Sequence, residues 1–262
     1  EDLLYIKMRI ARFISQDKSI QYGWIDEDRI GTIQGNPFGE YRRFEAKQKL
    51  NEVKLLAPCE PSKIIVVAHN FAYKSEKELT PPPDYPIFSF KPSSSVISSG
   101  EPILLPPQSQ RVEHEAELAV VIAKKARWLR QEDVQDAIFG YTIANDVTAR
   151  DLEIRDGHSS RAKGFDTFCP LGPWIETEFD PSDAIISCNV NSTMRQMAST
   201  RDMHFTIDRL LMFISSVMTL MPGDIVLTGT PNGSSTLEAG DVVTVNIAGI
   251  GNLVNPVRVA GN

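Results

Sequence analysis

The stretch that decides the fold is VEHEAELAVVIA, residues 112–123. Its second half is a nearly continuous apolar run, which is typical of a strand buried on both faces of a sheet. Glu115 and Glu117 stand two residues apart at its start, and the alternation of side chains along a strand points both carboxylates to one face. Because neighbouring carboxylates repel each other and are costly to bury, this arrangement calls for a compensating cation or proton.

A second apolar stretch, FGYTIANDV at residues 139–147, also reads as a buried strand, and Asp146 lies at its end. If Asp146 converges on Glu115 and Glu117, the three carboxylates form a site made of hard oxygen ligands. Oxygen ligation favours Mg²⁺, Mn²⁺ or Ca²⁺ over Zn²⁺. The spacing alone also fits an ordinary acidic pair at an exposed strand edge, so both interpretations stay open at this point.

Most of the remaining chain reads as short strands. Alternating patterns over residues 8–38 predict several of them, and the proline-rich junction at 58–61 marks a boundary. We therefore expect a small β-rich N-terminal domain at 1–57 and a larger domain at 58–262. Strands outnumber helices in this reading, which predicts a strand-rich α+β fold.

Few segments show helical spacing. Residues 207–221 do so most clearly, with Thr206 as the expected N-cap. A second helix is expected around 131–138. The stretch from about 150 to 170 reads as irregular, and loops of that length are uncommon unless they are functional.

Composition and charge limit the classes of function. The chain has 262 residues, with 27 Lys+Arg and 34 Asp+Glu, and its net charge of −7 argues against a basic surface that binds nucleic acid. No apolar run approaches the roughly 18 residues of a membrane span. Three widely spaced cysteines fit neither a disulfide framework nor a zinc site, so we expect a reducing, cytoplasmic location. We expect neither a nucleic acid nor a membrane as a partner.

Six motifs in order resemble the fumarylacetoacetate hydrolase superfamily. The resemblance covers roughly residues 54–250, while residues 8–53 look like the small N-terminal domain of many bacterial members. It implies a mixed β-sheet rolled around a metal site in a strand-rich α+β domain, and a homodimer. The motifs are KLLAP (54–58), KPSSS (91–95), VEHEAELAVVIAKKA (112–126), GYTIANDVTARDL (140–152), AKGFDTFCPLGP (162–173) and PGDIVLTGTPNG (222–233).

The resemblance also implies a site. Glu115, Glu117 and Asp146 match the family's ligands for Mg²⁺ or Mn²⁺. Lys163 matches a lysine that lines the metal site, and Thr230 matches a residue that contacts the substrate carboxylate. These two are therefore our catalytic candidates.

Further residues are candidates for substrate binding. Arg195-Gln196 resembles a substrate-side segment that the family often writes with the same pair, and Arg150 could face a dicarboxylate. Lys91 could do so as well, although a solvated surface position fits it equally. His69 is a candidate either as a displaced base or as an ordinary histidine at a strand end.

The family's shared chemistry acts on 2-oxo acids and acylpyruvates. The substrate chelates the metal through its ketone and carboxylate oxygens, and the metal stabilises the enolate that forms. Hydrolysis of a carbon–carbon bond, decarboxylation and isomerisation all pass through this enolate. Fold and metal therefore do not choose among these reactions.

One departure from the family pattern bears on this choice. Hydrolytic members carry GxNYxxHxxE after the first strand of the large domain, whereas here Lys74 and Lys77 stand at the His and Glu positions. A lysine is protonated near neutral pH, so it is a poor general base, although Lys74 could bind an acidic substrate. This favours isomerisation or decarboxylation of a 2-oxo or 2-hydroxydienoate dicarboxylate.

Two alternatives remain. The first is hydrolysis of an acylpyruvate or a fumarylpyruvate-type substrate, with water activated by a displaced base or by the metal. The second is a metal-binding homologue that has lost catalysis.

Overall fold

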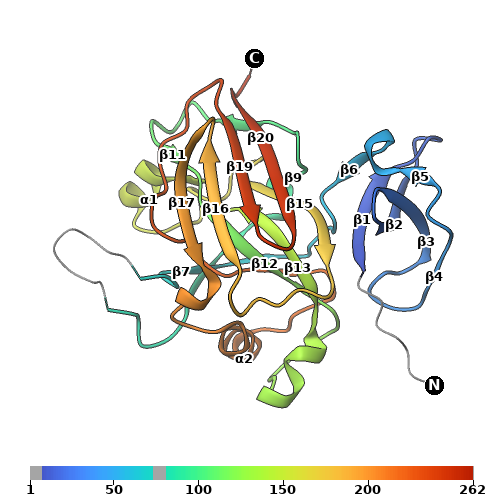
Figure 1. The fold of residues 1–262 in the computed structure, drawn as a ribbon. Helices are drawn as coiled ribbons and strands as arrows, with labels where there is room; N and C mark the ends of the chain where they lie inside the picture. Colours follow the sequence, from blue (N-terminus) through green and yellow to red (C-terminus); the bar gives the residue numbers. More distant parts are fainter. Residues whose placement is uncertain (1–7, 73–80, 262) are drawn as a thin grey trace.

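The computed structural model describes residues 8–72 and 81–261, and this part of the chain is built mainly from strands (Figure 1). The strand-rich α+β class expected from the sequence is confirmed. The N-terminal strands are β1 (Arg9–Ile14), β2 (Ile20–Asp26), β3 (Arg29–Gly35), β4 (Tyr41–Arg43), β5 (Gln48–Lys49) and β6 (Lys54–Leu56). The later elements are β7 (Ile64–Ala68), β8 (Ile87–Lys91), β9 (Val96–Ile97), β10 (Ile103–Leu105), β11 (Val112–Glu113), β12 (Ala116–Ile122), β13 (Ile138–Asn145), β14 (Thr148–Ala149), α1 (Arg150–Asp156), β15 (Cys169–Glu176), β16 (Ile185–Val190), β17 (Thr193–Ser199), α2 (Ile207–Val217), β18 (Ile225–Leu227), β19 (Val242–Ile247) and β20 (Gly251–Val259).

The strands form two large sheets and one small one. The largest sheet runs in the order β4-β3-β2-β1-β15-β13-β12-β18-β7-β8, and the second runs β10-β20-β19-β16-β17. Most neighbours are antiparallel, but β18 pairs with β7 and β10 pairs with β20 in parallel, so both sheets are mixed. The small pair β11-β14 lies beside the start of β12 and the end of β13 in the sequence, next to the acidic residues.

Strand β12 lies at the centre of the molecule. Leu118 and Val120 belong to the core between the two large sheets, together with Val245 of the second sheet. Ala119 and Val121 point to the opposite face and join a separate cluster. All seven residues of β12 are buried, so the expectation of a strand buried on both faces is confirmed.

The N-terminal strands extend the largest sheet. Strand β1 pairs with β15 through the register Arg9↔Glu176, and Ile10 packs in the same cluster as Val121. Figure 1 shows these strands, coloured blue, to the side of the larger body. The boundary that we place at residues 57/58 stays a prediction.

Helix α2 begins where the sequence predicts and ends earlier. The Thr206 side chain accepts a hydrogen bond from the backbone N–H of Arg209, which makes Thr206 the N-cap. The helix stops at Val217 rather than 221. The reason is that Leu220, which is fully buried, exchanges two backbone hydrogen bonds with Ala126, at 2.9 and 3.0 Å. This pairing requires an extended backbone.

Two further expectations about helices were wrong. The segment around 131–138 forms two short 3₁₀ turns, Gln131–Asp133 and Gln135–Ala137, instead of one helix. The stretch at 150–170 contains helix α1, which ends at Gly157 in the left-handed conformation (φ 71°). With only seven residues, α1 offers too little periodicity to be recognised from sequence, and it carries Arg150 to the acidic residues.

Candidate metal centre and active site

Three buried carboxylates meet where β12 begins and β13 ends. The two strands are antiparallel neighbours with the register Glu117↔Ala144, so the start of one adjoins the end of the other. Asp146 N–H donates to the Glu115 carbonyl at 2.8 Å and locks the two segments together. One carboxylate oxygen from each of Glu115, Glu117 and Asp146 lies within 4.8 Å of the others. The convergence expected for these residues is therefore present, and the alternative of an exposed acidic pair is wrong.

Lys163 lies among these carboxylates. Its ammonium donates to Asp146, to Glu115 Oε2 at 3.1 Å and to the Thr148 hydroxyl at 2.7 Å, and its side chain is buried. Burial on its own would lower the pKa of Lys163, but Asp146 and Glu115 outweigh it and raise that pKa. The ammonium therefore stays protonated and serves as a hydrogen-bond donor.

Lys91 is a second cation at the site, and the solvated position considered for it was wrong. It stands at the end of β8 with a fully buried side chain, and its ammonium lies 2.8 Å from Asp146 Oδ1. It also donates to the carbonyls of Val147 at 2.9 Å and of Lys163 at 3.1 Å. With three acceptors inside the protein, Lys91 supports Asp146 from within. The sequence signal that marks it is the KPSSS motif alone.

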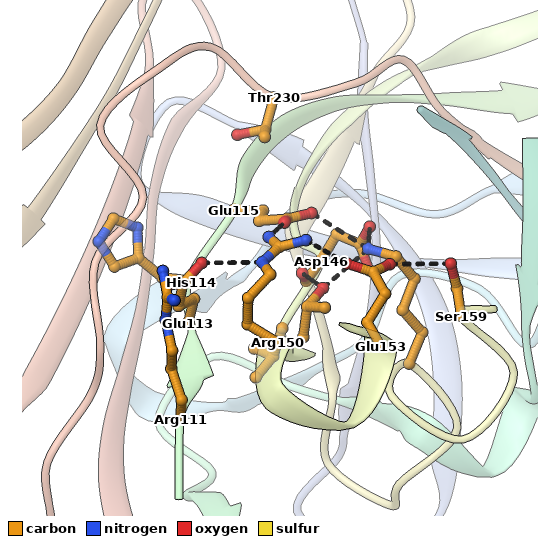
Figure 2. A network of polar contacts seen from close by, with 12 residues as sticks. Arg111, Glu113, His114, Glu115, Asp146, Arg150, Glu153, Ser159 and Thr230 are labelled. Carbon is orange, nitrogen blue, oxygen red and sulfur yellow. Dashed lines mark hydrogen bonds and ion pairs between the residues drawn. The ribbon is translucent and has the colours of Figure 1, made fainter. Parts of the chain in front are cut away.

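Arg150 is bound to carboxylates of the chain itself, as Figure 2 shows. Its guanidinium donates to Glu113 Oε2 at 3.0 Å and forms ion pairs with Glu115 and Glu153. Only 22% of its side chain is exposed. Arg150 thus holds Oε1 of Glu115 while Lys163 holds Oε2, and a substrate would have to compete with these partners.

The carboxylates differ in their electrostatic surroundings. Burial raises the pKa of Glu117 well above its usual range, and the nearby Asp146 and Glu115 raise it further. Burial also tends to raise the pKa of Asp146, but Lys163 and Lys91 outweigh it and lower that pKa to about 2. Within residues 8–72 and 81–261, Glu117 forms no ion pair, and its Oε2 accepts from the N–H of Gly229 at 2.6 Å. Glu117 is therefore the carboxylate with the greatest need of a further positive charge.

The donor set fits a divalent cation. Mg²⁺ and Ca²⁺ bind oxygens at about 2.0–2.6 Å, so two ligands on one ion stand at most about 4–5 Å apart. The three carboxylate oxygens meet that condition. Glu117, which lacks an ion-pair partner in the described part of the chain, is the residue that a cation would compensate. Glu115, Glu117 and Asp146 are thus the residues that would hold the ion.

Thr230 and Gln196 lie beside this centre and contact each other. Gln196 Nε2 donates to Thr230 Oγ1 at 2.9 Å, and the Thr230 hydroxyl donates to the carbonyl of Ala116 at 2.9 Å. Gln196 is 1% exposed, whereas its neighbour Arg195 is exposed on β17. The Gln196 side chain is therefore buried and bonded to Thr230 inside the protein, and it does not face solvent.

The other candidates are distributed as follows. His69 follows β7, is exposed and has a positive φ of 56°. Lys74 and Lys77 lie outside the described residues. His114, next to Glu115, is fully buried and points away from the carboxylates in Figure 2, toward Gln196 and Ser235.

Two open grooves on the N-terminal strands, of about 510 and 470 Å³, have no residue in common with the acidic centre. Their walls include Asp17 and Gln21 in one case, and Tyr22 and Phe44 in the other. The charged residues of these walls, Asp17, Lys47 and Glu52, are exposed, whereas the three carboxylates of the acidic centre are buried and converge. The acidic centre is therefore the candidate active site.

In the part of the chain that the structure describes, no helix is long and apolar enough to cross a membrane.

The sequence and the fold match a known family of enzymes. Residues 63–258 match the family model of the fumarylacetoacetate (FAA) hydrolase C-terminal domain, and residues 8–58 match the Rv2993c-like N-terminal domain. The chain belongs to the fumarylacetoacetate hydrolase family. Protein Rv2993c of Mycobacterium tuberculosis is 41% identical over 260 residues, which are 95% of this chain and 98% of that protein.

Solved structures and characterised relatives include both isomerases and hydrolases. The 2-hydroxyhepta-2,4-diene-1,7-dioate isomerase of Mycobacterium marinum has a TM-score of 0.89 and 38% identity, covering 97% of this chain and all of that one. Maleylpyruvate hydrolase of Sphingobium sp. SYK-6, solved with manganese(II) and pyruvate, has a TM-score of 0.78 and 30% identity over 96% of this chain and 99% of that one. The mitochondrial oxaloacetate tautomerase fahd2 of Xenopus laevis is 40% identical over 220 residues, 79% of this chain and 69% of that protein.

Proposed function

We propose that the protein is a divalent-cation-dependent isomerase that moves a proton between C3 and the C2 oxygen, or along the conjugated chain, of a 2-oxo or 2-hydroxydienoate dicarboxylate. The observation that carries this proposal is the set of three convergent carboxylates, Glu115, Glu117 and Asp146, within 4.8 Å of one another. When bound there, Mg²⁺ or Mn²⁺ would supply a Lewis acid that stabilises the negative charge of an enolate.

The charges around the centre favour an anionic substrate. Five carboxylates, those of Glu113, Glu115, Glu117, Asp146 and Glu153, stand against four cations, those of Lys91, Arg111, Arg150 and Lys163. The net charge of one negative becomes one positive when a divalent cation is added. A dicarboxylate is then attracted to a site within an otherwise acidic protein.

The roles of Lys163 and Thr230 follow from their contacts. Lys163 keeps its proton because Asp146 and Glu115 face it, so it is not suited to take a proton. It can donate to a substrate oxygen by giving up one of its three present acceptors, Asp146, Glu115 or Thr148. Thr230 lies beside Glu117 through the adjacent Gly229, whose N–H holds that carboxylate at 2.6 Å. Both residues can therefore orient a 2-oxo acid at the centre.

The relatives support isomerisation without deciding it. The isomerase and the tautomerase named above act through a proton shift, and a tautomerase substrate such as oxaloacetate is a 2-oxo dicarboxylate. The maleylpyruvate hydrolase keeps carbon–carbon hydrolysis as the alternative. Lys74 and Lys77 at the positions of the hydrolytic His and Glu favour the isomerase.

A turnover panel tests the proposal. The purified protein, with Mg²⁺ or Mn²⁺, is given the enol form of oxaloacetate, a 2-hydroxydienoate dicarboxylate and an acylpyruvate. We expect loss of the enol or a shift of the double bond without cleavage, and loss of this activity in Glu115→Gln. Glu60→Gln, which alters an exposed carboxylate paired with Arg12, serves as the control and should retain full activity.

Other products would contradict the proposal. Release of pyruvate and a free acid from the acylpyruvate would show a hydrolase, and CO₂ from the dicarboxylates would show a decarboxylase. Tight binding of metal and oxalate without turnover of any 2-oxo acid would show a homologue that has lost catalysis.

We also propose that the protein works as a homodimer. Among the strands of residues 8–72 and 81–261, β8 is the last at one end of the largest sheet, and Ile87 and Phe90 on it are 45% and 46% exposed. Tyr85, just before β8, is 62% exposed and stacks on Phe213 of α2. Exposed apolar side chains at a sheet edge are typical of interfaces. Light scattering after gel filtration should give twice the mass of the chain, and Phe90→Glu should shift it toward the monomer.

A further inference from the structure

A partly buried row of hydrogen bonds lies beside the acidic centre, and backbone groups determine which atom of each pair donates and which accepts. At its outer end the N–H of Ser235 lies 3.2 Å from Nε2 of His114 and donates to it. Nε2 is therefore an acceptor, and the ring carries its proton on Nδ1. Nδ1 lies 3.0 Å from Oε1 of Gln196 and donates to it.

Two backbone groups fix the orientation of the Gln196 carboxamide. The N–H of Ala116 lies 3.1 Å from one end of the amide and can only donate, so that end is the oxygen. The carbonyl of Pro231 lies 2.6 Å from the other end and can only accept, so that end is the nitrogen. The assignment of oxygen and nitrogen in Gln196 thus follows from its surroundings.

The same sequence of donors and acceptors continues from Gln196 to Thr230. Gln196 Nε2 donates one hydrogen to Pro231 and the other to Thr230 Oγ1, at 2.9 Å. The Thr230 hydroxyl then donates its own proton to the carbonyl of Ala116, at 2.9 Å. A hydroxyl has one proton and two lone pairs. What Thr230 retains for a ligand is one lone pair.

We propose that Gln196 is a positioning residue that holds the Thr230 hydroxyl as a hydrogen-bond acceptor, so that the ligand group it contacts is a hydroxyl donor such as the enol O–H of the substrate. The proposal rests on the proposed function, because it takes the acidic centre as the place where a 2-oxo acid and its enol bind. It differs from the sequence-based expectations, in which Gln196 belongs to a substrate-side segment and Thr230 contacts the substrate carboxylate. Under this proposal Gln196 acts through Thr230, and the Thr230 hydroxyl accepts a hydrogen bond from the ligand.

A carboxylate partner would require a different arrangement. To donate to it, the Thr230 hydroxyl would have to release the Ala116 carbonyl, which would leave a buried acceptor without a partner. Leaving such a group unpaired is costly. A ligand O–H pays no such cost, because it donates into the lone pair that is already available. The enol and the keto acid therefore differ in the contact that they make with Thr230.

Ligand binding distinguishes these cases without turnover. Glycolate carries a hydroxyl donor next to its carboxylate, whereas oxalate carries none, and both chelate a divalent cation. Their affinities for the Mg²⁺-loaded protein are measured by calorimetry. We expect Thr230→Val to weaken glycolate about tenfold, the equivalent of one hydrogen bond, and to leave oxalate nearly unchanged. Equal weakening of both, or a greater loss for oxalate, would overturn the acceptor role.

The control is Thr228→Val. Thr228 is fully buried and its hydroxyl donates to the carbonyl of Leu118 at 3.0 Å, a bond of the same kind as that between Thr230 and Ala116. This variant loses a hydroxyl from the same loop but leaves Thr230, which lies beside the acidic centre, unchanged. It should affect the two ligands equally.

A double-mutant cycle tests the role of Gln196. If Gln196 acts through Thr230, Gln196→Met should weaken glycolate about as much as Thr230→Val, about tenfold, and the double variant should lose little more. A loss in the double variant equal to the product of the single losses would show that Gln196 acts independently and would overturn the positioning role.

The proposed function can fail on its own. If the wild-type protein with Mg²⁺ binds neither ligand, the metal-dependent 2-oxo acid site is wrong, while the positioning role is still decided by urea unfolding of the same four proteins. Non-additive losses of stability for Gln196→Met and Thr230→Val would support the contact, and additive losses would overturn it.

Discussion

The ammonium of Lys91 lies 2.8 Å from Oδ1 of Asp146, and both side chains are fully buried. Burial alone would lower the pKa of this lysine, and Asp146 opposes that effect. A buried pair of this kind adds little stability over apolar side chains of the same shape, but removing one partner leaves an uncompensated charge. Lys91 therefore matters most through what its loss would do to Asp146.

Lys91→Met should destabilise the protein strongly. The substitution keeps the length of the side chain but leaves Oδ1 of Asp146 and the carbonyl of Val147 without the Lys91 ammonium, while Lys163 still holds the other oxygen of Asp146. We expect a loss of about 3–5 kcal/mol in the free energy of unfolding, measured with urea. The matched control is Lys124→Met, since Lys124 pairs with Asp136 at the surface, with 56% of the Lys124 side chain exposed, and its loss should have little effect. Equal losses in the two variants would contradict this account of Lys91.

Glu117→Gln should stabilise the metal-free protein. Burial, together with Asp146 and Glu115, raises the pKa of Glu117 above its ordinary value of 4.5. The folded state then holds this proton more tightly than the unfolded state, so stability is present below pH 4.5 and is lost as pH rises toward the raised pKa. Unfolding of metal-free protein at several pH values above 4.5 should show a steeper loss for the wild type than for Glu117→Gln. Identical pH dependence would show that Glu117 is not strained by its neighbours.

Gly233→Ala should disturb the loop that carries Thr230. Gly233 has φ +106°, and a Cβ there would lie 2.0 Å from the backbone oxygen of Arg195. Gly240 has a similar φ of +98°, with nothing within 4 Å of such a Cβ. Gly240→Ala therefore measures the conformational cost alone, about 1–2 kcal/mol. Gly233→Ala should cost clearly more stability and weaken glycolate binding, because Thr230 lies on this loop. If the two variants lose the same stability, close packing of this loop on β17 is not important.

The cysteine thiols should be inert in the folded protein. Cys59, Cys169 and Cys188 are all buried and free, and burial raises the pKa of each to about 12. Because the thiolate is the reactive form, Ellman's reagent should label none of them in native protein and all three after unfolding. Rapid labelling of a thiol in the native state would contradict the burial of that residue.

Much of the centre is predictable from sequence because its residues sit on elements with strong patterns. The apolar run that follows Glu117 specifies a strand buried on both faces, and the run before Asp146 specifies its neighbour. Two such strands, once paired antiparallel, bring the three carboxylates together. The start of α2 was equally clear, because Thr206 and the apolar spacing agree.

Other features depend on contacts between distant segments. Lys91 is buried because Asp146, Val147 and Lys163 surround it, and the local sequence around KPSSS does not predict those partners. Gln196 is likewise defined by what it touches across the fold. The end of α2 is set by the pairing of Leu220 with Ala126, which overrides helical periodicity.

The central claim is that Glu115, Glu117 and Asp146 hold a divalent cation, and calorimetric titration of metal-free protein with Mn²⁺ tests it most directly. We predict stoichiometric binding to the wild type and to the control Glu60→Gln, and loss of measurable binding in Glu117→Gln and Asp146→Asn. Mn²⁺ affinity that survives in both site variants, while both remain folded, would contradict the assignment of the metal centre.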